Sequence, residues 1–157
     1  MVMLNSTSRL SRIKSRVILT QTDTTVGFLS QDEIQLQEIK SRPSTKPFIK
    51  VYKNFKALKN DFKRVPNSKK SHLRRAKKTT FIVKNSAFRV AKYPLSSSLL
   101  YNTPWFYSTS ANESGKSFER NFCEKKTDII VEDKNALHEG EASKLYKINE
   151  TTIRRLR

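Results

Sequence analysis

Short runs rich in β-branched and aromatic residues recur along the whole chain, and polar or turn-forming residues bound each run. Runs of this kind are typical of the strands of a β-sheet. We predict strands at residues 16–20, 48–52, 79–83, 87–90, 105–108, 129–131, 145–148 and 151–153. None of the runs approaches the roughly 18 apolar residues that a membrane-spanning helix requires, so we expect no membrane partner.

Segments with helical signals lie between these strands. Ser30 and Glu33 are spaced as a capping box, in which each side chain bonds to the backbone N–H of the other residue, and Pro43 limits the helix that follows. Two further helices are predicted at residues 55–62 and 95–100. Strands interleaved with helices indicate an α/β (α+β) protein, and we expect a mixed sheet because some links are too short for a parallel crossover.

The length of 157 residues fits one domain over residues 1–157, with residues 1–12 expected to be frayed. Cys123 is the one cysteine of the chain, which excludes an intrachain disulfide, and we expect it to be a core residue. We expect His72 and His138 to be exposed. The first residues lack the apolar stretch of a secretory signal, so we expect a reducing, cytoplasmic location.

The chain carries 32 Lys and Arg against 14 Asp and Glu, a formal net charge of +18. Such a surplus attracts polyanions, including nucleic acids and nucleotide phosphates. The densest cluster comprises Lys69, Lys70, Arg74, Arg75, Lys77 and Lys78, and a second one comprises Arg154, Arg155 and Arg157. The dense cluster has two interpretations, a nucleic-acid-binding patch or a solvated loop, and net charge alone does not choose between them.

Glycine is scarce, and Gly27, Gly115 and Gly140 cannot form a P-loop or a GxGxxG phosphate cradle. Small hydroxyl and cationic residues are instead concentrated in the predicted loops 22–27, 40–43 and 108–115. Because ligands of open sheets bind outside the strand ends, three such loops can share one crevice. Lys40 and Arg42 would point to different faces of a helix, but Pro43 favours an extended backbone at Arg42, which lets both cations reach one anion.

Motifs in these loops resemble those of the YrdC/YciO family. Residues 22–28 (TDTTVGF) are similar to the family's PTDTVYGL, and residues 39–49 (IKSRPSTKPFI) resemble its KxRP…KPL segment. Residues 89–95 (RVAKYPL) resemble RVPxHPL, and residues 109–115 (TSANESG) match TSANxSG. Their order and approximate spacing agree from about Val17 to Arg154. The resemblance implies a YrdC/RibB-like fold, a twisted open mixed sheet flanked by helices.

Active members of this family are threonylcarbamoyl-AMP synthases. The resemblance therefore implies a nucleotidyltransferase that joins L-threonine, bicarbonate and ATP into threonylcarbamoyl-AMP and pyrophosphate. The product serves threonylcarbamoyladenosine formation on tRNA, so tRNA and a threonylcarbamoyl-transferase complex are the implied partners. Lys40 and Arg42 would offset the charge on the phosphates, together with Mg²⁺.

Carried over position by position, the resemblance implies specific binding residues. The implied ATP-binding residues are Lys40, Arg42, Thr80, Ser110, Asn112 and Arg154. The implied threonine-binding residues are Thr22, Arg89, Thr109 and Ser143. Ser110 and Asn112 would also offer oxygen ligands to Mg²⁺, a hard cation.

Each position also has a purely structural interpretation. Thr22, Ser110 and Asn112 are common turn formers, Thr80 fits a β-strand, and Arg89 can extend along a sheet surface toward water. The chain also departs from the family, with Gln21 and Val26 in the first motif, AKK at 76–78 where PGP is expected, and SKL at 143–145 in place of STV. A second hypothesis is therefore a catalytically degenerate member that binds RNA through its basic surface.

Overall fold

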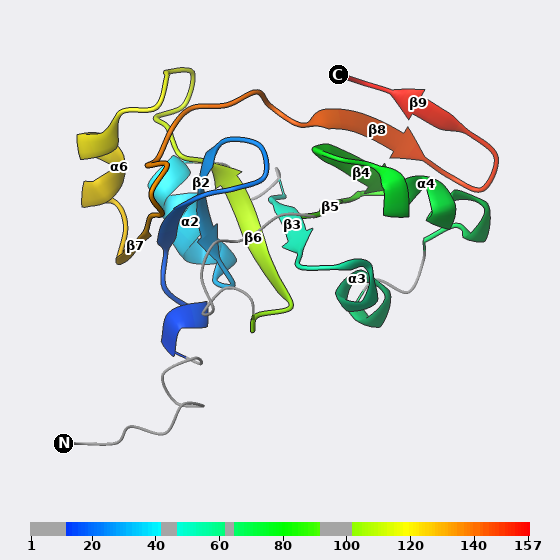
Figure 1. Cartoon of the computed structure of the whole chain (residues 1–157), viewed down its shortest axis with the longest axis horizontal. Coiled ribbons are helices and arrows are strands. Elements are labelled where there is room, and N and C mark those ends of the chain that lie inside the picture. Colours follow the sequence, from blue (N-terminus) through cyan, green and yellow to red (C-terminus); the bar gives the residue numbers. More distant parts are fainter. Residues whose placement is uncertain (1–11, 42–46, 62–64, 92–101) are drawn as a thin grey trace.

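A nine-stranded mixed sheet forms the centre of the described part of the chain, which comprises residues 12–41, 47–61, 65–91 and 102–157 of the computed structural model (Figure 1). The strand order is β7-β1-β2-β6-β3-β5-β4-β8-β9. Pairs β1–β7, β3–β5 and β4–β8 are parallel, whereas the other pairs are antiparallel. The predicted mixed sheet flanked by helices is therefore confirmed.

The bounds of the elements agree with most of the predicted runs. The strands are β1 (Ile18–Gln21), β2 (Val26–Ser30), β3 (Ile49–Tyr52), β4 (Thr79–Val83), β5 (Ser86–Val90), β6 (Trp105–Ser110), β7 (Ile129–Val131), β8 (Lys144–Ile148) and β9 (Ile153–Arg155). The helices are α2 (Glu33–Lys40), α3 (Phe55–Asp61), the 3₁₀ turn η1 (Asn67–Lys69), α4 (Lys70–Arg75) and α6 (Arg120–Lys125). Within the described ranges, no helix has the length and apolar character needed to cross a membrane.

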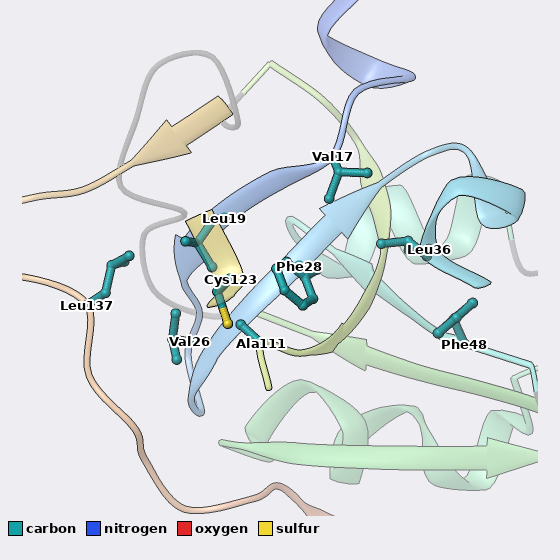
Figure 2. Close-up of a cluster of buried hydrophobic side chains, with 9 residues drawn as sticks. All are labelled: Val17, Leu19, Val26, Phe28, Leu36, Phe48, Ala111, Cys123 and Leu137. Atoms are coloured by element: carbon teal, nitrogen blue, oxygen red, sulfur yellow. The ribbon is translucent and has the colours of Figure 1, made fainter. Parts of the chain in front are cut away.

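One hydrophobic cluster lies where α2 and α6 pack on β1 and β2 (Figure 2). Leu19 and Phe28 from the strands pack with Leu36 of α2 and Cys123 of α6, and all four side chains are fully buried. Burial of a large apolar side chain contributes about 1.5–3 kcal/mol. The prediction that Cys123 is a core residue is confirmed, and burial raises the pKa of its thiol.

A second cluster lies under α3 and α4. Leu58 of α3 and Leu73 of α4 pack with Phe81 and Phe88, which belong to the antiparallel β4–β5 hairpin. The sequence predicts this hairpin to within one residue, and Lys84 adopts a positive φ of 55° in its turn. The two clusters fix the helices on one face of the sheet and leave alternate strand residues to line the other face.

The segment that leads into α2 differs from the prediction. The loop predicted at residues 22–27 ends earlier, because a strand that the sequence did not predict, β2, begins at Val26. All residues of β2 are buried, so no alternation of apolar and polar side chains marks it. Ser30 ends β2, and Asp32 is the N-cap of α2, with its carboxylate accepting from the N–H groups of the first turn. The helix ends at Lys40, before Pro43, as predicted.

One of the two interpretations of the basic segment and one predicted strand need correction. The basic segment 69–78 is mostly helical rather than a loop, since η1 and α4 occupy most of it and Leu73 is buried. The last strand, β9, comprises Ile153–Arg155 rather than the predicted residues 151–153. The Asn149 side chain accepts from the N–H groups of Thr151 and Thr152 and so holds these two residues in a turn. The predicted helix at 95–100 lies outside the described residues. His72 and His138 are exposed, as predicted.

Candidate functional site

A cavity of about 260 Å³ lies on the face of the sheet that carries Arg89. The turn between β1 and β2, the end of β6 and the segment before β8 surround it. It is lined by Thr22, Thr24, Thr25, Gly27, Pro47, Ile49, Arg89, Ser108, Thr109, Ser110, Ala142, Ser143 and Arg157. The structure therefore brings all four residues predicted to bind threonine (Thr22, Arg89, Thr109 and Ser143) to the cavity, and adds Ser110 from the predicted ATP site. Thr109 reaches it through its backbone, because its side chain alternates with those of Ser108 and Ser110 along β6.

The turn at residues 22–25 forms one wall of the cavity. Thr22 Oγ1 donates to the Thr25 carbonyl (2.7 Å) and accepts from the Thr24 N–H (3.2 Å), so the hydroxyl closes the turn. Behind it, a Cβ on Gly27 would lie 3.0 Å from Thr22 Cγ2 and 3.1 Å from the Thr109 carbonyl oxygen. Gly27 thus allows the turn to approach β6 closely, and the structural interpretation of Thr22 is compatible with its place in the cavity.

A buried ion pair joins Arg89, which lines the cavity, to Asp23 of the neighbouring turn. Arg89 Nε donates to Asp23 Oδ1 at 3.0 Å, and the two side chains are only 5% and 7% exposed. Arg89 Nη1 also donates to Thr80 Oγ1 (3.3 Å), which shares a hydrogen bond of 2.8 Å with Ser143 Oγ. Arg89 therefore does not extend toward water at a sheet surface. Thr80, predicted as an ATP contact, is fully buried and reaches the cavity through Ser143.

Lys40 connects the end of α2 to the loop that follows β6. Its Nζ donates to the carbonyl oxygens of Ser110 (3.1 Å) and Asn112 (2.7 Å) and to Asn112 Oδ1 (2.9 Å). Ser110 Oγ donates to the same Oδ1 at 2.7 Å. Residues some 70 positions apart in the sequence thus converge, as the shared-crevice prediction requires. Arg42, the other predicted catalytic cation, lies outside the described residues.

The predicted magnesium ligands do not fit a metal site held by the protein. The Asn112 Oδ1 atom, which would face the metal, already accepts from Lys40 and from Ser110. The Lys40 ammonium occupies the position a cation would take and would repel Mg²⁺. Among the described residues, no group of His, Cys, Asp and Glu is arranged to hold a metal ion.

The arginine that reaches the cavity is not the predicted one. Arg154 lies on β9 opposite Lys147 and does not line the cavity. Arg157 lines it instead, and its Nε donates to the Ser143 carbonyl at 3.1 Å. The Arg157 backbone bonds to Leu145 through both its N–H and its carbonyl group, which brings this residue back over β8. The sequence signal was the cluster of three arginines, but spacing alone did not say which one points inward.

The basic segment 69–78, formed by the end of η1, by α4 and by the residues before β4, contributes no side chain to this cavity. None of its six cations (Lys69, Lys70, Arg74, Arg75, Lys77 and Lys78) lines the cavity, and none pairs with a carboxylate of the described residues. Arg74 lies over the Phe55 ring, 4.5 Å from its centroid. The side chains of the predicted nucleic-acid patch therefore do not line the predicted substrate cavity, although the Lys78 carbonyl oxygen accepts from the N–H of Lys144, next to Ser143.

A second cavity, of about 310 Å³, lies on the other face of the sheet. It is lined by Lys50 and Tyr52 of β3, whereas Ile49 of the same strand lines the first cavity. Lys50 Nζ lies 2.7 Å from Asp61 Oδ2 and 3.9 Å from the Trp105 ring centroid. The Tyr52 hydroxyl donates to the same Asp61 oxygen at 2.6 Å. Burial and the neighbouring Asp61 carboxylate raise the pKa of Tyr52 far above its ordinary value. Partial burial alone would raise the pKa of Asp61, but the bonds from Lys50 and Tyr52 outweigh it and hold this pKa below its ordinary value.

Comparison with known proteins gives one sequence match and several structural ones. The sequence profile of the Sua5/YciO/YrdC family, described as "Telomere recombination", matches residues 13–157. No curated protein sequence matches the chain. Among solved structures, P. abyssi Sua5 complexed with L-threonine has a TM-score of 0.73 at 18% identity, covering 96% of this chain and 52% of that one. E. coli YciO has a TM-score of 0.59 at 17% identity, covering 96% and 86%. At these identities the likeness shows the fold, and the chain spans about half the length of the Sua5 structure.

Proposed function

Because the chain belongs to the Sua5/YciO/YrdC family, we propose that it is a nucleotidyltransferase that makes L-threonylcarbamoyladenylate from L-threonine, bicarbonate and ATP. The observation that carries this proposal is the convergence of Thr22, Arg89, Thr109 and Ser143 on one cavity, with Lys40 bound at its Ser110 edge. A relative of the same fold, P. abyssi Sua5, has been solved in complex with L-threonine, and a phosphate- and nucleotide-bound HypF shares the fold at 13% identity.

The proposed reaction needs charge compensation rather than covalent help from the protein. The threonine amine and bicarbonate give the N-carboxy derivative and water. A carboxylate oxygen of this derivative then attacks the α-phosphorus of ATP, and the bond to the departing pyrophosphate breaks. Lys40, Arg42 and Arg157 would offset the negative charge on the phosphates during this step. Any Mg²⁺ would enter as the counter-ion of ATP, because Ser110 and Asn112 are engaged with Lys40.

The product has a defined use under this proposal. Threonylcarbamoyl-AMP would pass to a tRNA threonylcarbamoyl-transferase complex, so that complex and its tRNA are the proposed partners. Thr22, Arg89, Thr109 and Ser143 would hold the amino acid, whereas Ser110 and Asn112 would lie near the nucleotide. Thr80 would support Ser143 rather than touch ATP, because it has no exposed surface.

Pyrophosphate release tests the proposal. We expect release from ATP that requires both L-threonine and bicarbonate. Lys40→Ala should lower turnover by about 10²-fold or more, as the loss of one electrostatic donor does in other enzymes. Lys56→Ala, which removes an exposed cation from α3, is the matched control and should retain the wild-type rate. A Lys40→Ala variant with full turnover would remove this residue from the mechanism.

A second candidate function is RNA binding by a catalytically degenerate member of the family. The distribution of charge supports it, because no Asp or Glu occurs between Asp61 and Glu113, and the basic cations of η1 and α4 have no carboxylate partner among the described residues. Tight, salt-sensitive tRNA binding without pyrophosphate release would favour this candidate. Changing Lys69, Lys70, Arg74 and Arg75 to Gln should then weaken binding, whereas Lys125→Gln with Lys126→Gln on α6 should not.

A further inference from the structure

A segment without helix or strand contributes one wall of the cavity. Residues 132–143, here called the strap, link β7 to β8, which lie near opposite ends of the sheet (Figure 1). Leu137 anchors the strap in the first hydrophobic cluster, where it is 9% exposed (Figure 2). Ala142 and Ser143, at the other end of the strap, line the cavity. The strap therefore connects the apolar core to one wall of the candidate site.

The strap bonds to the 22–25 turn and its neighbours between these two ends. The His138 carbonyl accepts from the Val26 N–H (3.3 Å), and the His138 N–H donates to Gln21 Oε1 (3.0 Å). Two residues later, the Gly140 N–H donates to Thr25 Oγ1 at 3.0 Å. The Thr25 hydroxyl thus joins two segments that are 115 residues apart in the sequence.

Gly140 lies so close to the turn that no side chain fits there. A Cβ at this position would overlap the Thr24 carbonyl oxygen and lie 3.3 Å from the Thr24 carbonyl carbon. These atoms belong to the backbone, so they cannot move aside as the tip of a flexible side chain does. Because Thr24 and Ala142 both line the cavity, this close contact sets the separation of two of its walls.

The far end of the strap is held independently. Ser143 bonds through its hydroxyl to Thr80 and through its carbonyl oxygen to Arg157. Loss of the Gly140 contact would therefore loosen the turn against the strap, which His138 still holds at Gln21 and Val26, without detaching Ser143 from the cavity. The two contacts can be tested separately.

We propose that Gly140 and its hydrogen bond to Thr25 are a positioning contact that holds the strap and the 22–25 turn together as adjoining walls of the cavity, and so sets the affinity of the amino-acid substrate. This inference rests on the proposed function. Gly140 acts through the turn, and the groups that would touch the substrate are those of the turn and of Ser143. We expect the contact to affect binding of the amino acid more than the step at phosphorus, because Thr22 and Ser143, which would hold the amino acid, belong to the two segments next to it.

Two variants of Thr25 isolate the hydrogen bond. Thr25→Val removes the acceptor with little change of shape, and Thr25→Ser keeps it. With Thr25→Val we expect the KM for L-threonine to rise about five- to tenfold, the effect of one lost neutral hydrogen bond, while kcat and the KM for ATP change less than about twofold. Thr25→Ser should restore the wild-type KM. Glu139→Ala, which alters an exposed neighbour in the strap, is the control and should leave all three constants unchanged.

Hydrogen exchange of the Gly140 amide measures the same contact and does not require the protein to be catalytically active. The Gly140 amide should be protected in the wild type, lose at least about tenfold of its protection in Thr25→Val, and regain it in Thr25→Ser. An unchanged KM for L-threonine, or equal increases for L-threonine and ATP, would overturn the inference. If the wild type releases no pyrophosphate but the Gly140 amide still loses protection in Thr25→Val, the proposed function fails while the strap contact is supported. If protection of the Gly140 amide is the same in the wild type and in Thr25→Val, the contact itself is refuted.

Discussion

The two faces of the sheet each hold an ion pair, and the pairs differ in burial and in the elements they join. Arg89–Asp23 lies on the cavity face with side chains 5% and 7% exposed, and it joins β5 to the β1–β2 turn. Lys50–Asp61 lies on the helix-covered face with side chains 25% and 38% exposed, and it joins β3 to α3. The shorter N–O distance belongs to the more exposed pair, 2.7 Å against 3.0 Å. Distance alone therefore does not rank their importance.

Burial decides what happens when either pair is broken. Removing one partner of a buried pair leaves a charge without compensation in a medium of low dielectric constant, whereas water screens the survivor of an exposed pair. Arg89 also depends on Thr80 for a further bond, so its guanidinium is fixed in orientation. We infer that the cavity pair fixes the geometry of the site, while the helix-face pair adds modestly to the docking of α3.

The largest effect is expected at Asp23. Asp23→Asn leaves the Arg89 guanidinium buried without a counter-charge and should lower the free energy of unfolding by about 3–5 kcal/mol. Urea denaturation measures this loss. Adding Arg89→Met to Asp23→Asn should recover much of it, because the double variant buries no charge. The control Glu113→Gln breaks an exposed pair with Lys116 and should leave the free energy of unfolding nearly unchanged. An equally small cost for Asp23→Asn would contradict the contrast between the two faces.

A smaller effect is expected at Asp61. Asp61→Asn should cost about 0.5–1 kcal/mol at pH 7, because the pair with Lys50 is partly exposed and its attraction is screened. The pKa of Asp61 is lowered in the folded protein, so its contribution is complete above the unfolded-state pKa of about 3.9 and disappears as the pH falls through the folded value. Urea denaturation at pH 7 and at pH 3 should therefore show that the difference in the free energy of unfolding between wild type and Asp61→Asn is smaller at pH 3. A difference that grows toward low pH would contradict this sign.

The smallest effect is expected at Thr20, and it should be stabilising. The Thr20 hydroxyl is fully buried and has no hydrogen-bond partner in the part of the chain that the structure describes. Thr20→Val replaces it with a group of the same shape that needs no partner, so the free energy of unfolding should rise by up to about 1 kcal/mol. A thermal unfolding scan of both proteins measures the change. A clear loss of stability would mean that the hydroxyl has a partner.

Prediction from the sequence succeeded where a pattern is local. The β4–β5 hairpin shows β-branched runs around a short turn, so it was identified. Prediction failed at β2, whose burial on both faces removes the alternation that marks a strand. The sequence prediction also assigned the N-cap of α2 to Ser30, whereas the structure has Asp32 there. Both residue types suit an N-cap, and only the pairing of Ser30 with Tyr107 of β6 shows that Ser30 belongs to the sheet.

The sequence by itself determined the family, most of the strands and the residue types that the site contains, because motifs and hydrophobic periodicity are properties of neighbouring residues. Only the tertiary structure decided which of these residues meet. Strand order brings Lys40 to Asn112 and Arg89 to Asp23, and the strap carries Gly140 back to Thr25. The structure also selected Arg157 over Arg154, since the path of the chain after β9 decides which guanidinium reaches the cavity. Such contacts join residues far apart in the chain, and they depend on packing that no local pattern encodes.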